Sequence, residues 1–355
     1  MKAKTTVPLS TGDSRRAVAR FGRAPRTPAV PLLPPDADQQ TWLDARRKGP
    51  EGYRIGASEI AAVLGESPWQ SPFSLWWGKH AGWQTSQDRA QRWGHKLEAV
   101  IAEVFAEDRP DLLVCRAGAA LWAHPEHPWM TCSPDFLAVR LGVCTDERGG
   151  TCEHPPHLPC GRPHVEPVEC KSDKGGKGWG KPGTNQVPAH HRMQLLWQCA
   201  IFNAPRGHLV RNDVPYVVEY DDAARAEVAQ WIERAREFVT SLEIGAAPNP
   251  DGHKATERAL IDLNPAVDVG ETAVVGDDIA EAYETWHDQL AFVKDQFEQA
   301  RNQLRAAMGR AESAMTGDGR VFAKRSVFKR RGYEVAPCVV DRLDRKHDND
   351  KEQAK

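Results

Sequence analysis

A carboxylate and an ammonium group lie two positions apart at the end of the apolar stretch "VEPVECKS". Residues i and i+2 of a strand point to the same face, so Glu169 and Lys171 share one face. Asp135 opens a second apolar stretch, "SPDFLAV". If the two strands pair as a hairpin, Asp135 and Glu169 meet at one end and can share Mg²⁺, with the Cys170 carbonyl as a third oxygen ligand. Such a site suits phosphodiester hydrolysis, because the metal polarises the phosphoryl oxygen and Lys171 can orient the attacking water.

The same residues also have an ordinary interpretation, because Glu-x-Lys occurs in many strands as an exposed ion pair of ~0–1 kcal/mol. Two helix residues favour the metal site. Glu98, in the amphipathic stretch "RWGHKLEAVIAEVFAEDRP", can join the metal from a different element, and Gln194, in "VPAHHRMQLLWQCAIFNA", can contact a phosphate or a water. Each would be an unremarkable helix residue if it stood alone.

The loop "KSDKGGKGWGK" follows the second strand and places three lysines beside the proposed site, Lys174, Lys177 and Lys181. Lysines there can neutralise the phosphates of a nucleic acid, and the glycines give its backbone room. The alternative is a mobile surface loop.

Composition and charge limit the class of protein. The chain has 355 residues, a net charge of −2 and 27% charged residues, which is typical of a globular protein whose nucleic-acid affinity would come from local basic patches. No apolar run approaches the ~20 residues that span a bilayer, and the N-terminus does not read as a secretory signal. We therefore expect a cytoplasmic protein.

The pattern along the chain predicts several segments. Over residues 39–245 the expected order is helix, strand, strand, helix, strand, strand, helix, which indicates an α/β fold with a mixed central sheet flanked by helices. The remaining segments are a disordered basic arm (1–38), a linker (246–275), a heptad-patterned helix with a basic strand-like stretch (276–338) and a polar tail (339–355). The arm and the basic stretch are candidates for DNA contact or simply solvated, and the helix packs on its own domain or on a partner.

Residues 41–245 resemble the YqaJ-like viral recombinases, which are phage lambda-exonuclease-type nucleases of the PD-(D/E)xK superfamily. Co-linear stretches carry the resemblance: Trp42 to Arg46, "IGASEIAAVLGESPWQSPFSLWWGKHAG", "WGHKLEAVI", "SPDFLAV", "VECKS" and "HHRMQLLWQCAIF". The resemblance implies a restriction-endonuclease-like fold.

The resemblance also implies roles for individual residues. Mg²⁺ or Mn²⁺ would be held by Glu98, Asp135, Glu169 and the Cys170 carbonyl, with Lys171 as the catalytic lysine and Gln194 lining the site. Arg46 and Ser58 match the pair that grips the 5′-phosphate of the strand being degraded. Arg54 is a substitute for Arg46, because the gap from Arg46 to Ser58 is longer here.

Family members degrade one strand of linear duplex DNA from its 5′ end and pass the 3′ overhang to a single-strand annealing protein. The lambda-type enzymes are trimeric rings, which implies a homo-oligomer here.

An insertion over residues 142–166 departs from the family pattern. It holds three cysteines and several histidines, which could bind structural Zn²⁺ through Cys144, Cys152, Cys160 and His164. The spacing fits no C-x₂-C pattern, so a flexible cysteine-bearing hairpin is the alternative.

The leading hypothesis is a metal-dependent 5′–3′ DNA exonuclease for phage-type recombination. The alternatives are an endonuclease that cuts at junctions or specific sites, and a non-catalytic, zinc-organised DNA-binding module.

Overall fold

The computed structural model describes residues 27–82, 89–117, 119–140, 143–145, 151–153, 165–173 and 175–329. The chain divides into one compact unit that ends at Leu263 and a second that begins at Asn264.

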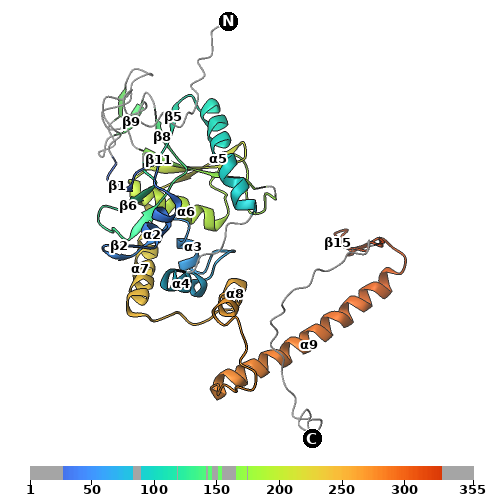
Figure 1. Cartoon of the computed structure of the whole chain (residues 1–355). Coiled ribbons are helices and arrows are strands. Elements are labelled where there is room, and N and C mark those ends of the chain that lie inside the picture. Colours follow the sequence, from blue (N-terminus) through green and yellow to red (C-terminus); the bar gives the residue numbers. More distant parts are fainter. Residues whose placement is uncertain are drawn as a thin grey trace. The chain divides into compact units, whose positions relative to one another are not determined.

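A mixed five-stranded sheet forms the centre of the first unit (Figure 1). Its order is β13-β12-β11-β8-β5. Strand β11 runs parallel to β12, and the other neighbouring pairs are antiparallel. The strands are β5 (Leu112–Arg116), β8 (Phe136–Arg140), β11 (Val165–Lys171), β12 (Arg206–Arg211) and β13 (Val214–Glu219).

Two helices cover opposite faces of this sheet, as Figure 1 shows. Because successive strand residues alternate between faces, Val168 and Cys170 of β11 point one way and pack with α5 (Arg89–Asp108), whose Ile101 and Phe105 are buried. On the other face α6 (Ala189–Phe202) lies against β11 and β12, and most of its apolar residues are buried. The predicted α/β architecture with a mixed sheet flanked by helices is confirmed.

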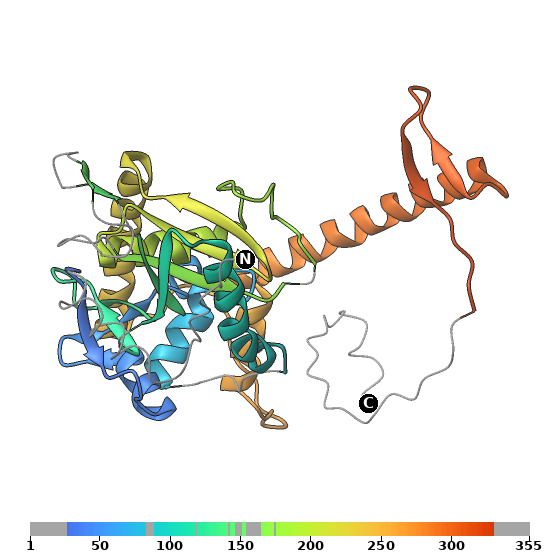
Figure 2. The same ribbon diagram turned by 90° about the horizontal axis from the view of Figure 1, so that it is seen from above.

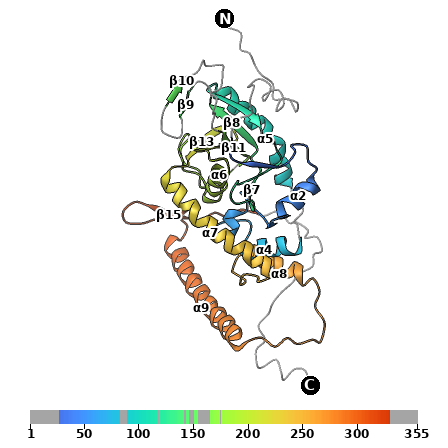
Figure 3. The same cartoon turned by 90° about the vertical axis from the view of Figure 1, so that its left-hand side faces the viewer.

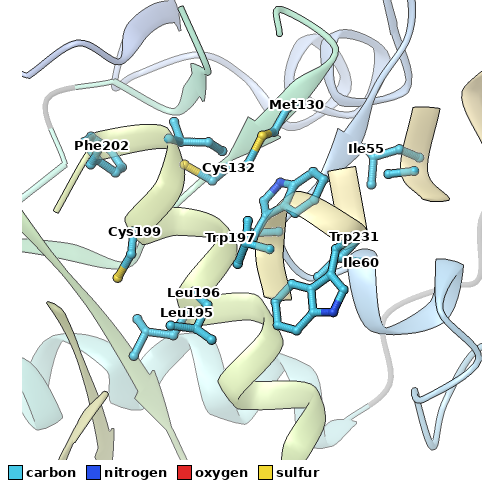
Figure 4. Close-up of a cluster of buried hydrophobic side chains, with 14 of the residues drawn as sticks. Ile55, Ile60, Met130, Cys132, Leu195, Leu196, Trp197, Cys199, Phe202 and Trp231 are labelled. Carbon is cyan, nitrogen blue, oxygen red and sulfur yellow. The ribbon is translucent and has the colours of Figure 1, made fainter. Parts of the chain in front are cut away.

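The α6 face holds the larger hydrophobic core. Figure 4 shows Leu195, Leu196 and Trp197 of α6 together with Ile60 and Trp231 from other helices. Each large apolar side chain removed from water contributes about 1.5–3 kcal/mol, so this core fixes the position of α6 under the sheet.

A second, four-stranded sheet has the order β1-β6-β7-β4. Its strands are β1 (Val30–Leu33), β6 (Leu121–Ala123), β7 (Met130–Cys132) and β4 (Ile55–Gly56). Strand β1 corrects the prediction of a disordered arm over residues 1–38, since it pairs with β6 and the preceding Ala29 is buried. The apolar run "AVPLL" pairs despite Pro31 because it forms an edge strand. Residues 1–26 lie outside the described part of the chain.

Short elements complete the N-terminal half of this unit. Helix α2 (Gln39–Arg47) is capped by Asp38, whose side chain accepts a hydrogen bond from the Thr41 backbone N–H. The others are β2 (Lys48–Gly49), β3 (Gly52–Tyr53), α3 (Ile60–Val63) and α4 (Pro72–Ala81).

Two helices end the first unit. Helix α7 (Asp222–Ile244) ends at Gly245, whose positive φ of +73° suits glycine. Helix α8 (Lys254–Leu263) lies beside α4 (Figure 3), where the Ser71 and Thr256 hydroxyls are 2.6 Å apart. Residues 246–275 were predicted to be a linker, and α8 corrects this: Pro and Gly near residue 250 are followed by a short amphipathic helix with buried Ala259.

Within the 142–166 insertion, the described backbone forms a small hairpin of β9 (Val143–Thr145) and β10 (Thr151–Glu153). Its register pairs Cys144 with Cys152.

The second unit consists of the long helix α9 (Asp277–Met308) followed by the hairpin β14 (Ser313–Met315) and β15 (Val321–Lys324), as Figure 2 shows. The heptad-patterned stretch is therefore helical, and a strand forms within the basic stretch. No helix in the described parts of the chain is both long and apolar enough to cross a membrane.

Candidate active site

Glu169 lies near the end of β11 and is 3% exposed. Its carboxylate accepts hydrogen bonds from two amides of α6: Gln194 Nε2 bonds to Oε1, and Gln198 Nε2 bonds to Oε2 at 2.8 Å. The Lys171 ammonium donates to Oε1 at 2.7 Å. Gln194 and Gln198 are one helical turn apart, so the packing of α6 holds both oxygens of Glu169 in place.

Asp135 lies just before β8, next to the end of β11. The β8–β11 register ends at the pair Phe136 and Val168, and one further step would place Asp135 opposite Glu169. Residues opposite one another in an antiparallel pair point to the same face. Asp135 Oδ2 accepts a hydrogen bond from the Cys170 backbone N–H at 2.8 Å, which fixes its carboxylate against β11.

The site carries an excess of negative charge. Burial, followed by the charges of Glu169 and Glu98, raises the pKa of Asp135 well above its usual value, and Lys171 only partly offsets them. Burial disfavours the charged form of Lys171, but the carboxylates of Glu169 and Asp135 outweigh burial and raise its pKa. Lys171 is therefore a fixed ammonium ion at neutral pH, and one cation serves several carboxylates.

Glu98 enters from the opposite side of the sheet, on α5. It is bound to Nδ1 of His95 at 2.8 Å, and its charge acts on Asp135, Cys170 and Lys171 alike. Gly94, one turn earlier, gives α5 room at the end of β11, because a Cβ there would come within 3.3 Å of Ser172 Oγ.

Oxygen donors and unbalanced negative charge fit a hard divalent cation in their chemistry. As the side chains stand, however, no three His, Cys, Asp or Glu residues within the described ranges are gathered closely enough to hold a metal ion. The described side chains therefore form a cluster of carboxylates that is held by the Lys171 ammonium and by the amides of Gln194 and Gln198.

The glycine- and lysine-rich loop is held in place beside the site. Asp173 accepts hydrogen bonds from the Gly175 backbone N–H and from Trp179 Nε1, both at 2.8 Å. Arg211 of β12 bonds to the Asp173 carbonyl, and Gly176, at a φ of +64°, leaves room for the Arg211 guanidinium, which a Cβ would meet at 2.9 Å. Lys177 and Lys181 are exposed on this loop, and Lys174 lies outside the described residues.

Two histidines of α6 adjoin Lys171 but add no positive charge. Burial and the nearby Lys171 lower the pKa of His190, and burial, Lys171 and His190 lower that of His191 to about 2. Both imidazoles are neutral at physiological pH.

A second polar cluster joins α2 to the turn before α3. Arg46 Nη2 donates to Ser58 Oγ at 2.7 Å and forms an ion pair with Glu59 at 3.1 Å, and Lys79 Nζ lies 2.9 Å from Glu59. Burial disfavours the charge of Glu59, but Arg46 and Lys79 outweigh it and lower its pKa. Burial lowers the pKa of Lys79, and the adjacent Glu59 only partly offsets this. With Lys79 protonated, it and Arg46 outnumber the one carboxylate by a single positive charge beside the exposed Ser58 hydroxyl.

Of the two arginines expected near Ser58, the contact belongs to Arg46. Arg54 is 5% exposed, is paired with Glu51 and donates to the Ala45 carbonyl at 2.8 Å. Arg54 therefore supports the end of α2 and is not offered to solvent.

Trp42 connects this cluster to the carboxylates. Its ring lies under the Arg46 guanidinium, 5.1 Å from centroid to Cζ, and its Nε1 donates to Ser133 Oγ at 3.0 Å. Ser133 is two residues from Asp135. A chain of contacts thus runs from Arg46 through Trp42 to the segment that positions Asp135.

Sequence reasoning missed Gln198, Glu59 and Lys79. The signal for Gln198 was its position one turn after Gln194 in an otherwise apolar helix. Glu59 and Lys79 gave no such signal, because they meet only when α4 packs against the turn before α3. The proposed zinc ligands Cys160 and His164, and the side chains of Cys144 and Cys152, lie outside the described residues.

Comparison with known proteins agrees with the motifs. Residues 41–205 match the sequence model of the YqaJ-like viral recombinase domain. The family resemblance drawn from the motifs is confirmed for this part of the chain. A 106-residue stretch, 29% of this chain, is 34% identical to the uncharacterized protein YqaJ of Bacillus subtilis (strain 168), of which it spans only 31%.

Among solved structures, an alkaline exonuclease from Laribacter hongkongensis aligns with a TM-score of 0.42 and 18% identity, over 63% of this chain and 100% of that chain. The shutoff and exonuclease protein of Kaposi's sarcoma-associated herpesvirus aligns with a TM-score of 0.30 and 11% identity, over 62% of this chain and 68% of that chain.

Proposed function

We propose that this chain is a metal-dependent DNA exonuclease that degrades one strand of linear duplex DNA from its 5′ end. The observation that carries the proposal is the buried Glu169, held by Gln194, Gln198 and Lys171 beside an Asp135 of raised pKa. The match of residues 41–205 to the YqaJ-like viral recombinase domain supports it.

In this proposal Asp135, Glu169, the Cys170 carbonyl and Glu98 hold Mg²⁺ or Mn²⁺. The ion would polarise the phosphoryl oxygen and lower the pKa of a bound water. The amides of Gln194 and Gln198 keep Glu169 oriented as a ligand. Lys171, protonated because its pKa is raised, donates to a phosphate oxygen or to the attacking water and does not serve as the base.

The cations around the carboxylate cluster are proposed to contact the DNA. The exposed Lys177 and Lys181 lie on the anchored loop and can neutralise backbone phosphates. Lys174 belongs to the same loop and is proposed to act with them. None of these contacts reads a base, which suits an enzyme that digests DNA of any sequence.

The cluster of Arg46 and Ser58 is proposed to bind the 5′-terminal phosphate. A guanidinium and a hydroxyl 2.7 Å apart, with a net +1 charge around them, form a donor set for a terminal phosphate. End recognition favours exonuclease over endonuclease action. The 3′ overhang would then pass to a single-strand annealing protein, and the ring-shaped trimer implied by the family is the proposed assembly of the nuclease unit.

The test is digestion of a linear duplex with Mg²⁺ present. Substrates carry a fluorophore at the 3′ end of one strand and either a phosphate or a hydroxyl at the 5′ end of that strand. We expect mononucleotide release, faster from the phosphorylated end. Arg46→Gln should remove this preference while the rate on the hydroxyl end stays within about threefold, since Lys79 still pairs with Glu59 and the carboxylate cluster is unchanged.

Three outcomes would contradict the proposal. Equal rates on both ends in the unmodified enzyme would exclude the phosphate pocket. Rapid nicking of a covalently closed circle would favour an endonuclease, and no cleavage of any DNA with either metal would favour the non-catalytic binding module.

A further inference from the structure

Helix α9 presents a continuous apolar stripe. Its members recur at alternating steps of four and three residues: Ile279, Tyr283, Trp286, Leu290, Val293, Phe297, Ala300 and Leu304. With Ile279 at heptad position d, every a and d position from 279 to 304 is apolar. A period of 3.5 residues keeps such a stripe in register with another supercoiled helix.

The stripe is exposed. The six large residues from Ile279 to Phe297 are each at least 40% accessible, and α9 has no buried residue. Helices gain most of their stability from packing an apolar face, so a 32-residue helix with none packed lacks its main source of stability. A partner helix of matching length would supply it.

Within the described residues, the other long helices, α5 and α7, lack an exposed apolar stripe of similar length. Helix α7 uses its apolar side on its own core, with Val228, Trp231, Phe238 and Leu242 buried. Helix α5 exposes Trp93, Val100 and Val104, a stretch less than half as long as the stripe. Helix α9 of another copy carries the same heptad repeat over the same length.

The charges beside the stripe distinguish two orientations. The e positions carry His287, Lys294 and Arg301, and the corresponding g positions carry Gln289, Gln296 and Gln303. In an antiparallel pair e faces e, which brings the cations Lys294 and Arg301 of one helix toward the basic e positions of the other. In a parallel pair e faces g, which opposes cations to neutral amides that can accept hydrogen bonds from them.

We propose that α9 forms a parallel coiled coil with α9 of other copies of this chain. The acidic residues Glu281, Asp288 and Asp295 occupy the outward f positions, where they keep the assembly hydrated. Joined copies would hold a second active site near the same DNA end at high effective concentration.

The test is disulfide cross-linking of the full chain without DNA, which makes it independent of the proposed nuclease activity. Leu304→Cys places a thiol at an a position near one end of α9, and Asn302→Cys places one at the outward f position as the matched control. After mild oxidation we expect Leu304→Cys to give at least tenfold more covalent dimer than Asn302→Cys or the unmodified chain.

A second pair of variants tests the stripe itself. In the Leu304→Cys background, Val293→Glu should abolish the cross-link, and Phe292→Glu should leave it unchanged. Phe292 and Val293 are adjacent and 66% and 59% exposed, but only Val293 belongs to the stripe. Circular dichroism of both variants monitors the helix, whose signal should fall only with Val293→Glu.

Three results would overturn the inference. The first is the absence of a Leu304→Cys cross-link at micromolar concentration. The second is an equal effect of Glu at 292 and 293. The third is preferential linkage between Ile279→Cys and Leu304→Cys chains in a mixture, which would indicate an antiparallel pair.

Discussion

Two buried glutamates lie three residues apart on β11, and each is 3% exposed. Glu166 is bonded to His208 Nε2 at 2.6 Å and has Arg140 and Arg206 at 3.7 and 3.8 Å. Glu169 is held mainly by neutral amides and shares its one ammonium, Lys171, with Asp135 and Glu98. The spacing of three puts the two carboxylates on opposite faces of the strand.

The difference between them lies in charge balance. Glu166 is matched by surrounding cations, as a buried charge must be if burial is not to be costly. Around Glu169 negative charge is in excess, and burial together with the charges of Glu169 and Glu98 raises the pKa of Asp135. A structure keeps such an imbalance where a further cation, such as a metal ion, can bind. The exposed fraction of the two glutamates is the same, so burial alone does not distinguish the carboxylate with matched charge from the one without it.

Making the same substitution at both positions is the strongest test of the difference between Glu166 and Glu169. Glu169→Gln should lower DNA cleavage by at least about 10³-fold, because it removes a charged ligand that the proposed metal needs. Glu166→Gln should leave the rate per folded molecule within about twofold. Single-turnover digestion of a labelled duplex measures both, and similar losses at the two positions would end the distinction.

The free energy of unfolding should respond in the opposite order, with the larger loss for Glu166→Gln. Glu166→Gln should cost about 3 kcal/mol in the free energy of unfolding, because it leaves the buried His208 without its carboxylate partner. Arg140 and Arg206 lose one partner each and keep Asp111 and Glu219. Glu169→Gln should cost much less, since removing its charge also relieves Asp135. Urea unfolding without added metal measures both, and a greater loss for Glu169→Gln would contradict the account.

The cluster of Arg46, Ser58, Glu59 and Lys79 adds a pH-dependent prediction. Arg46 and Lys79 lower the pKa of Glu59 below its usual 4.5 against the effect of burial. Its stabilisation is therefore present above pH 4.5 and is lost as pH falls through the lowered pKa. Glu59→Gln should cost about 2 kcal/mol at pH 7, and the difference from the unmodified chain should shrink below pH 4. Thermal unfolding at both pH values measures this, with the more exposed Glu51→Gln as control; a pH-independent difference would contradict it.

The smallest expected effect concerns the link between the two clusters. Trp42→Phe keeps a ring under Arg46 but loses the hydrogen bonds of Nε1 to Ser133 and Ala120. We expect a stability loss of about 1 kcal/mol and a several-fold weaker preference for a 5′-phosphate. Trp69→Phe, at a 78% exposed tryptophan, is the control. An unchanged preference would show that the clusters act separately.

The sequence alone allowed prediction of site residues that are placed by the periodicity of a single strand or helix. Glu169 and Lys171 alternate on one strand, and Gln194 follows helical periodicity, so their elements could be predicted. The contact of Lys79 with Glu59 depends on how α4 packs, and the balance around Glu166 depends on the parallel pairing of β11 with β12, which places His208 beside it. Strand β1 and helix α8 were missed because proline and glycine nearby indicated loops.

The central claim is tested most directly by titrating Mn²⁺ into the protein and following the electron paramagnetic resonance signal of the free ion. We expect the unmodified chain and Glu166→Gln to remove Mn²⁺ from solution, and Asp135→Asn and Glu169→Gln to lose at least tenfold in affinity. Equal Mn²⁺ binding by all four proteins, or none by the unmodified chain, would contradict a metal site at the end of β11.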